Sequence, residues 1–130
     1  MDLLRLPGRF AVCRLAPNAA LPDWARGGFI SITRTPEELS LLCEEANLPQ
    51  SETEFKAERG WAGLKVKGPL EFTEIGILAA LAAPLAQRRI SIFVVSTFDT
   101  DYLFVKEVQL LEAVAALKEA GHSISGGENG

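Results

Sequence analysis

The sequence predicts an α+β fold of ferredoxin-like type over residues 61–124, in the order strand, helix, strand, strand, helix, strand. Two observations lead to this prediction. Apolar and β-branched residues fill positions 90–95 and again 102–105, and residues 98–101 between them have the composition of a turn, as is typical of a β-hairpin. Helical patterns lie on both sides of the hairpin, and a short strand follows the second helix.

Composition excludes several classes of protein. A chain of 130 residues forms one domain or two very small ones that share a core. A net charge of −4 and a pI of about 5.0 argue against a nucleic-acid partner bound through phosphate contacts. Because arginines interrupt the segment from Met1 to Leu15 and no apolar run reaches spanning length, we expect a cytoplasmic protein without a membrane partner. Cys13 and Cys43 lack metal-ligand spacing, so we expect reduced core thiols, with a redox pair as the alternative.

Residues 1–60 predict a smaller, β-rich unit. Residues 8–15 alternate loosely between apolar and polar positions and predict a strand, and residues 29–33 predict another. Residues 16–28 contain two prolines and a glycine pair, so we expect a loop with at most one helical turn, around Trp24.

The next segment permits two interpretations. Thr35 can cap a helix and Pro36 suits the first helical position, so residues 35–38 locally predict the start of a helix. The alternative is a turn, followed by a strand that begins at Leu39.

An internal repeat favours the turn. Residues 30–48 align with residues 92–110 without a gap, with five identities in nineteen positions. The alignment places Thr35 on Thr97, and both copies have strand–turn–strand character. We therefore predict a turn and a strand over residues 36–43.

The first copy is expected to be degenerate. Residues 16–28 are too short and too broken for the helix that precedes the hairpin in the second copy. Residues 47–54 predict a weak short helix, and residues 55–59 a closing strand. The expected organisation is a degenerate unit over residues 1–60, a complete unit over 61–124 and a flexible tail over 125–130.

The second copy opens with a strand over residues 61–66 and a turn over residues 67–70. Thr73 can cap the helix that follows, and Pro84 should kink this helix or begin its last turn. Four apolar residues at helical spacing are expected to form its buried stripe: Ile75, Leu78, Ala82 and Leu85.

A second helix is predicted over residues 107–120, with Leu110, Val114 and Leu117 on its buried face. Gly121 suits the position just after the helix, and residues 122–124 predict a short edge strand.

Two motifs of the second copy resemble a known family. They are the run Lys65-Val-Lys-Gly-Pro-Leu-Glu-Phe-Thr-Glu-Ile-Gly-Ile-Leu78 and the hairpin with its Ser96-Thr-Phe-Asp-Thr-Asp101 turn. They are similar to the paired signatures of small tandem ACT-domain proteins, which include bacterial members, the animal cytosolic arginine sensors and, more distantly, the regulatory part of aspartate kinases. Residues 36–43 resemble the first-copy motif. The resemblance covers residues 10–124 and implies an ACT domain preceded by a degenerate ACT-like half-repeat.

The resemblance implies an amino-acid ligand at an interface between two ACT units, beside the turn at residues 68–73. Gly68 would permit close approach of a backbone, and free N–H groups at a helix start suit a carboxylate. Gly76, inside the predicted helix, costs about 1 kcal/mol relative to alanine, which an approaching ligand would explain. The alternative is that Gly68 only makes a turn and Gly76 only permits helix–sheet contact. The candidate ligand-binding residues are Gly68, Pro69, Leu70, Phe72, Thr73, Gly76, Thr97, Thr100 and Asp101.

Carboxylates at the hairpin turn are the second part of this hypothesis. Asp99 or Asp101 could pair with a ligand ammonium or guanidinium through charge-assisted bonds. The resemblance to the arginine sensors points to Asp101. The alternative for both aspartates, and for Thr97 and Thr100, is that they bond the local backbone.

The expected function is that of a non-enzymatic regulator. It would bind a free amino acid or similar small ligand at an ACT–ACT interface and alter its contact with a partner protein by linkage. A homodimer would supply the missing partner surface. The alternative is a ligand-free dimerisation or protein-interaction module. No phosphate loop, metal-ligand cluster or nucleophile–base pair is present in the sequence, and His122 is the only histidine, so neither catalysis nor a cofactor is expected.

Overall fold

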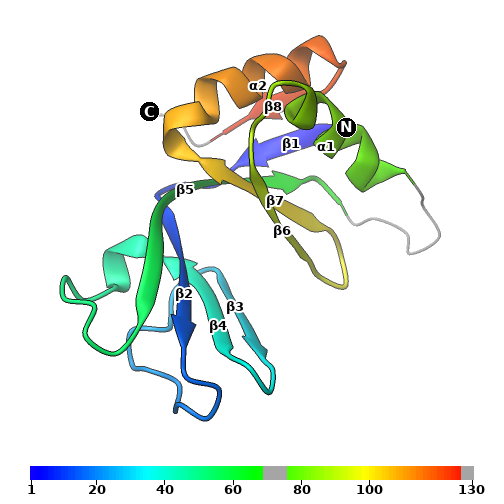
Figure 1. The fold of residues 1–130 in the computed structure, drawn as a ribbon. Helices are drawn as coiled ribbons and strands as arrows, with labels where there is room; N and C mark the ends of the chain where they lie inside the picture. Colours follow the sequence, from blue (N-terminus) through cyan, green and yellow to red (C-terminus); the bar gives the residue numbers. More distant parts are fainter. Residues whose placement is uncertain (69–75, 127–130) are drawn as a thin grey trace. The chain divides into compact units, whose positions relative to one another are not determined.

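The computed structural model describes residues 1–68 and 76–126 (Figure 1). The chain divides into two compact units. The N-terminal unit is Gly8–Trp61, and the C-terminal unit combines Met1–Pro7 with Ala62–Gly130. The strands are β1 (Asp2–Arg5), β2 (Phe10–Leu15), β3 (Ile30–Arg34), β4 (Leu39–Glu44), β5 (Lys56–Val66), β6 (Ile92–Ser96), β7 (Asp101–Lys106) and β8 (Ser123–Ser125). The helices are α1 (Ile77–Gln87) and α2 (Leu110–Glu119), and the single 3₁₀ turns are η1 (Glu45–Asn47) and η2 (Glu107–Gln109).

The N-terminal unit is an antiparallel sheet in the order β3-β4-β2-β5. Its core consists of inward-facing residues from β2 and β4 together with Leu48: Ala11, Cys13, Leu15, Leu39, Leu41, Cys43 and Leu48. The rings of Trp24 and Phe55, with centroids 4.8 Å apart, pack against this core from the connecting segments. As the sequence predicted, residues 16–28 contain no helix.

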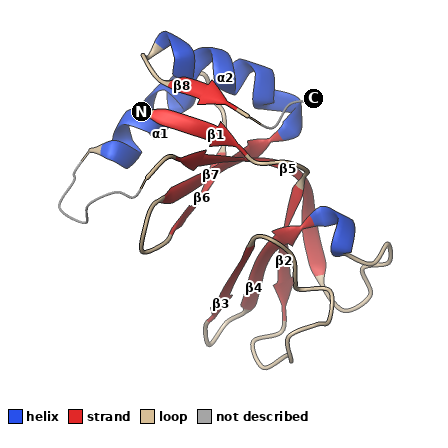
Figure 2. Ribbon diagram, turned by 180° about the vertical axis from the view of Figure 1, so that it is seen from behind, coloured by secondary structure: helices blue, strands red, loops and turns tan. Residues whose placement is uncertain are grey.

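The C-terminal unit has the predicted ferredoxin-like order β5-α1-β6-β7-α2-β8 (Figure 2). Its strands lie in the order β6-β7-β5-β1-β8, and both helices share one core with the sheet. The largest buried side chains of that core are Leu3, Leu64, Val66, Leu81, Leu85, Leu103, Val105 and Leu117.

Strand β1 was not predicted from the sequence. It lies between β5 and β8, antiparallel to β5 and parallel to β8. With four residues, the strand is too short to show the alternation of apolar and polar residues by which a strand is predicted. Its Leu3 is fully buried. The described residues of this unit therefore form five strands where the sequence predicted four.

The internal repeat has a counterpart in the structure. The same alignment that places Ile30 on Ile92 also places β3, β4 and η1 on β6, β7 and η2, with the same first and last positions. Strand register agrees as well, because Ile30 lies opposite Cys43 and Ile92 lies opposite Val105. The turn predicted after β3 is confirmed, and the local signal for a helix there is overridden.

Two expectations for residues 47–59 are wrong. The short helix expected over residues 47–54 is absent from this described segment, and the 3₁₀ turn η1 includes only its first residue, Asn47. The closing strand expected over residues 55–59 and the next one, over 61–66, form the single strand β5. Gly60 lies within β5 at φ 81°, and its N–H donates to Glu45 Oε1 (2.8 Å), so a locally distorted strand continues where the sequence suggested a break.

Helix α1 begins later than predicted. Gly76 is not inside the helix: it precedes Ile77 with φ 80°, and a Cβ there would contact nothing within 4 Å. Glycine is therefore favoured here by its left-handed backbone conformation, and not by the close approach of another group. The buried side chains are Leu81 and Leu85, with Ile77 packed against the core, whereas Leu78 is 38% exposed. The expected contributions of Leu78 and Ala82 to the buried stripe are therefore wrong. Thr73 and Ile75 lie outside the described residues.

The second helix agrees with its prediction. Leu110, Ala113, Ala116 and Leu117 of α2 are buried, and Val114 packs beside them. Gly121 follows the helix at φ 99°, and β8 is an edge strand. Among the described residues, neither helix has the length and apolar character required to span a membrane.

Candidate ligand-binding site

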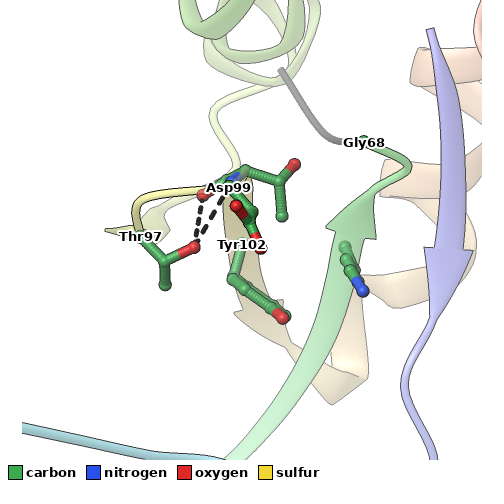
Figure 3. A pocket seen from close by; sticks show the side chains of 6 residues that line it. Gly68, Thr97, Asp99 and Tyr102 are labelled. Atoms are coloured by element: carbon green, nitrogen blue, oxygen red, sulfur yellow. Dashed lines mark hydrogen bonds between the residues drawn. The ribbon is translucent and has the colours of Figure 1, made fainter. Parts of the chain in front are cut away.

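A pocket of about 320 Å³ lies in the C-terminal unit, between the β6–β7 turn and the end of β5 (Figure 3). Its described lining residues are Lys65, Gly68, Thr97, Asp99, Thr100 and Tyr102. The described lining residues therefore come from three segments: the end of β5 with Gly68 after it, the turn, and the start of β7.

The turn is shaped by the side chain of Thr97 (Figure 3). The N–H of Thr97 donates to the carbonyl oxygen of Thr100 (2.8 Å), and the Oγ1 hydroxyl of Thr97 donates to the same oxygen (3.0 Å). In return, the N–H of Thr100 donates to Thr97 Oγ1 (3.3 Å). Thr97 thus bonds the local backbone, as one of the two interpretations of the sequence proposed.

Thr100 joins this turn to the central strand. Its side chain is buried, with 4% of its surface exposed, and its hydroxyl donates to the carbonyl oxygen of Val66 (2.6 Å). A buried hydroxyl without a partner would cost about 1–3 kcal/mol, so this bond stabilises the position of the turn beside β5.

Two opposite charges line the pocket without pairing. Lys65 is half-buried and Asp99 is exposed. Neither side chain has a hydrogen bond or ion pair with any described residue. The pocket therefore presents an ammonium group, which can donate to a ligand carboxylate, and a carboxylate, which can accept from a ligand ammonium.

The structure brings together only part of the predicted ligand-binding set. Gly68, Thr97 and Thr100 line the pocket. Asp101 and Gly76 are not among its lining residues, and Asp101 lies opposite Ser96 as the first residue of β7. Its role as a ligand contact stays a prediction. Pro69, Leu70, Phe72 and Thr73 lie outside the described residues.

Lys65 and Tyr102 were missed by the sequence analysis. Both alternate with core residues: Lys65 lies between buried Leu64 and Val66, and Tyr102 precedes buried Leu103. Because successive strand residues point to opposite faces, this alternation places both side chains on the face of the sheet away from the helices. A search for polar side chains on that face could have found them.

Comparison with known protein families gives two matches. The ACT-domain profile matches residues 56–119, and an N-terminal-domain profile of a second family matches residues 8–51. The cytosolic arginine sensor for mTORC1 subunit 1 of Bos taurus is 33% identical over 105 residues, which are 75% of this chain and 32% of that protein. The human protein of the same name is 32% identical over 107 residues, which are 76% of this chain and 32% of that protein. The chain thus spans about a third of the length of these relatives.

Several solved structures are similar. A protein from Agobacterium tumefaciens is 40% identical, with a TM-score of 0.89 over 98% of this chain and 94% of that one. A Vibrio cholerae protein of unknown function, described as a possible transport protein, is 25% identical, with a TM-score of 0.71 over 92% and 88% of the two chains. The regulatory subunit of aspartate kinase from Thermus thermophilus has a TM-score of 0.63 over 93% and 98% of the chains at 11% identity, a likeness of fold alone.

Proposed function

This chain belongs to the ACT-domain family, and we propose that it is a non-enzymatic regulatory protein that binds a free amino acid. The observation that carries the proposal is the pocket at the β6–β7 turn, in which Lys65 and Asp99 present opposite charges without an ion-pair partner among the described residues. An α-amino acid carries both complementary groups on one carbon atom. Arginine enters as one candidate ligand through the name of the animal sensors.

Lys65 would donate to the ligand carboxylate, and Asp99 would accept from the ligand α-ammonium. Charge-assisted bonds of this kind are about twice as strong as bonds between neutral groups. Because Thr100 is already bonded to Val66, its role would be to hold the turn and with it Asp99.

The second ACT surface would come from another copy of the chain. Of the described strands, only β7 pairs with β6, so the outer edge of β6 has no strand beside it. The segment Ile92-Phe-Val-Val95 includes neither a charge nor a proline, the usual devices that protect an edge strand. Antiparallel pairing of β6 with its copy would form a homodimer and bring a second subunit close to the turn.

The N-terminal unit would be a degenerate ACT-like half-repeat, since residues 30–47 repeat the hairpin and 3₁₀ turn of the complete unit without its first helix. Ligand binding would favour one arrangement of the units and so change the affinity for a partner protein in the cytoplasm.

A thermal-shift screen of the full chain against the twenty amino acids tests this proposal. A ligand that binds only the native state at 100 times its Kd adds about 2.7 kcal/mol to the free energy of unfolding and so raises Tm. We expect a rise with at least one amino acid and its loss in Asp99→Asn. Asp23→Asn, at an exposed aspartate of the N-terminal unit, is the matched control, and Asp101→Asn tests separately whether that residue contacts the ligand. No shift with any amino acid would contradict the proposal.

A ligand-free interaction module is the second candidate, and one observation favours it. Val108 and Leu111 are 95% and 88% exposed, and their i, i+3 spacing places them on the same side of the chain where α2 begins. Under this alternative, Leu111→Glu would weaken self-association while every amino acid leaves Tm unchanged. Analytical ultracentrifugation together with the same screen distinguishes the two candidates.

A further inference from the structure

The turn that borders the pocket has a copy in the N-terminal unit. There the N–H of Thr35 donates to the carbonyl oxygen of Glu38 (2.9 Å), and the N–H of Glu38 donates to Thr35 Oγ1 (3.1 Å). Thr97 and Thr100 make the same two bonds at the equivalent positions of the second copy. The two turns can therefore be compared atom by atom.

The strand beside each turn also carries a cation at the same place. Arg14 is the penultimate residue of β2, and Lys65 is the penultimate residue of β5. Both are preceded and followed by buried residues: the inward-facing set is Ala11, Cys13 and Leu15 in one strand and Ala62, Leu64 and Val66 in the other. Arg14 and Lys65 thus hold matching positions in the two units.

In the N-terminal unit the cation reaches the turn. The Nη2 group of Arg14 donates to the carbonyl oxygen of Glu37 (3.1 Å), and its Nε atom lies 3.9 Å from Glu38 Oε1. Glu37 is the counterpart of Asp99. In the C-terminal unit, by contrast, Lys65 and Asp99 make no such contact within the described part of the chain, and the pocket lies beside them.

From this comparison we infer that Lys65 makes the pocket discriminate against amino acids with a cationic side chain, such as arginine and lysine. The inference rests on the proposed function, because it concerns the same site. The ligand takes the place that the guanidinium of Arg14 fills in the other unit, beyond the shorter side chain of Lys65. Its carboxylate meets Lys65 and its α-ammonium meets Asp99. Each of the two charged protein side chains then has one ligand group of opposite charge as its partner.

A ligand side chain with its own positive charge disturbs that match. Lys65 repels a second cation several ångströms away by on the order of 1 kcal/mol at the effective dielectric constants of protein surfaces, which is about a tenfold loss of affinity relative to the same pocket without this charge. Asp99 attracts that cation whether or not Lys65 is present, so the contribution of Lys65 is the difference between the wild-type chain and a Lys65 variant. An acidic side chain is repelled by Asp99 in the same way. Specificity here comes from a repulsive contact as well as from attractive ones.

Calorimetric titration of the full chain with arginine and with citrulline isolates this charge, because citrulline has nearly the shape of arginine without the guanidinium charge. The twenty amino acids are compared alongside. We expect the ratio of citrulline affinity to arginine affinity to be about tenfold lower in Lys65→Gln than in the wild-type chain. Lys67→Gln, at an exposed lysine that does not line the pocket, should keep the wild-type ratio.

The outcomes separate the two proposals. If amino acids bind and the affinity ratio is the same in Lys65→Gln as in the wild-type chain, the selectivity inference is overturned while the proposed function stands. If no amino acid binds the wild-type chain, the proposed function itself fails.

Discussion

The hydroxyl of Thr100 donates a 2.6 Å hydrogen bond to the carbonyl oxygen of Val66, which lies far earlier in the chain. This bond joins the hairpin turn that carries Asp99 to the end of the strand that carries Lys65. The position of one charged group relative to the other therefore depends on a buried neutral contact between them.

Removal of this hydroxyl should destabilise the C-terminal unit. Valine has nearly the same size as threonine but lacks the hydroxyl, so in Thr100→Val the carbonyl oxygen of Val66 loses the hydrogen bond from residue 100. We expect the free energy of unfolding to fall by about 1–3 kcal/mol. Urea denaturation measures the change. Thr100→Ser keeps the hydroxyl and should lose less. Equal stability of the valine and serine variants would show that the hydrogen bond contributes nothing.

Gly63 is required for a different reason, namely space. A Cβ atom at this position would lie 2.8 Å from Phe104 Cε2 and 2.9 Å from Leu6 Cδ1. Because Phe104 is fully buried, its ring cannot move away freely, and we expect Gly63→Ala to cost about 1–3 kcal/mol.

A double-mutant cycle tests this contact. Phe104→Leu removes the ring, so the loss in the double variant should be smaller than the sum of the two single losses. Additive losses in urea denaturation would mean that the alanine methyl group does not meet the ring.

Gly60, also in β5, is required for its backbone conformation. Its φ of 81° lies in the left-handed region, and a Cβ atom there would meet nothing within 4 Å. We expect Gly60→Ala to cost about 1–2 kcal/mol, and Gly60→Asn to cost less because asparagine tolerates this region better. If alanine and asparagine were equally tolerated in thermal denaturation, strain at this residue would be excluded as the cause.

The sequence was most informative where it repeats. The alignment of residues 30–48 with 92–110 predicted a turn against the local signal of Thr35 and Pro36, and the structure has that turn. A helix start depends on a few residues, whereas the strands on both sides of the turn are fixed by cross-strand packing over their whole length. Tertiary pairing therefore outweighed local propensity.

The lining of the pocket could be predicted only in part from the sequence. The motifs that resemble the ACT family predicted binding residues close to one another in the chain, around Gly68 and Asp101. Lys65 and Tyr102 come from two strands that pair only in the folded sheet, and nothing in the sequence between them records their proximity. The start of α1 was misplaced because a glycine ahead of a helix and a glycine within it look alike in a single sequence.

The two cysteines form the last testable feature. Cys13 and Cys43 lie on the core-facing side of β2 and β4, diagonally across the strand pair, and their side chains are 1% and 0% exposed. Both are free thiols. The hydrogen bond to Cys43 raises the pKa of the Cys13 thiol, and burial raises it further. A thiol in this state is protonated at neutral pH and is a poor nucleophile.

Because both side chains are buried, we expect slow alkylation of both cysteines by iodoacetamide at pH 8 in the native protein and rapid alkylation in urea, measured by mass spectrometry. If the cysteines of the native protein were alkylated as fast as those of the unfolded protein in urea, the burial of the two thiols would be contradicted. Ready loss of two hydrogen atoms under a mild oxidant, with the native fold retained, would instead establish a redox pair, because a disulfide between neighbouring strands needs both sulfurs within bonding reach.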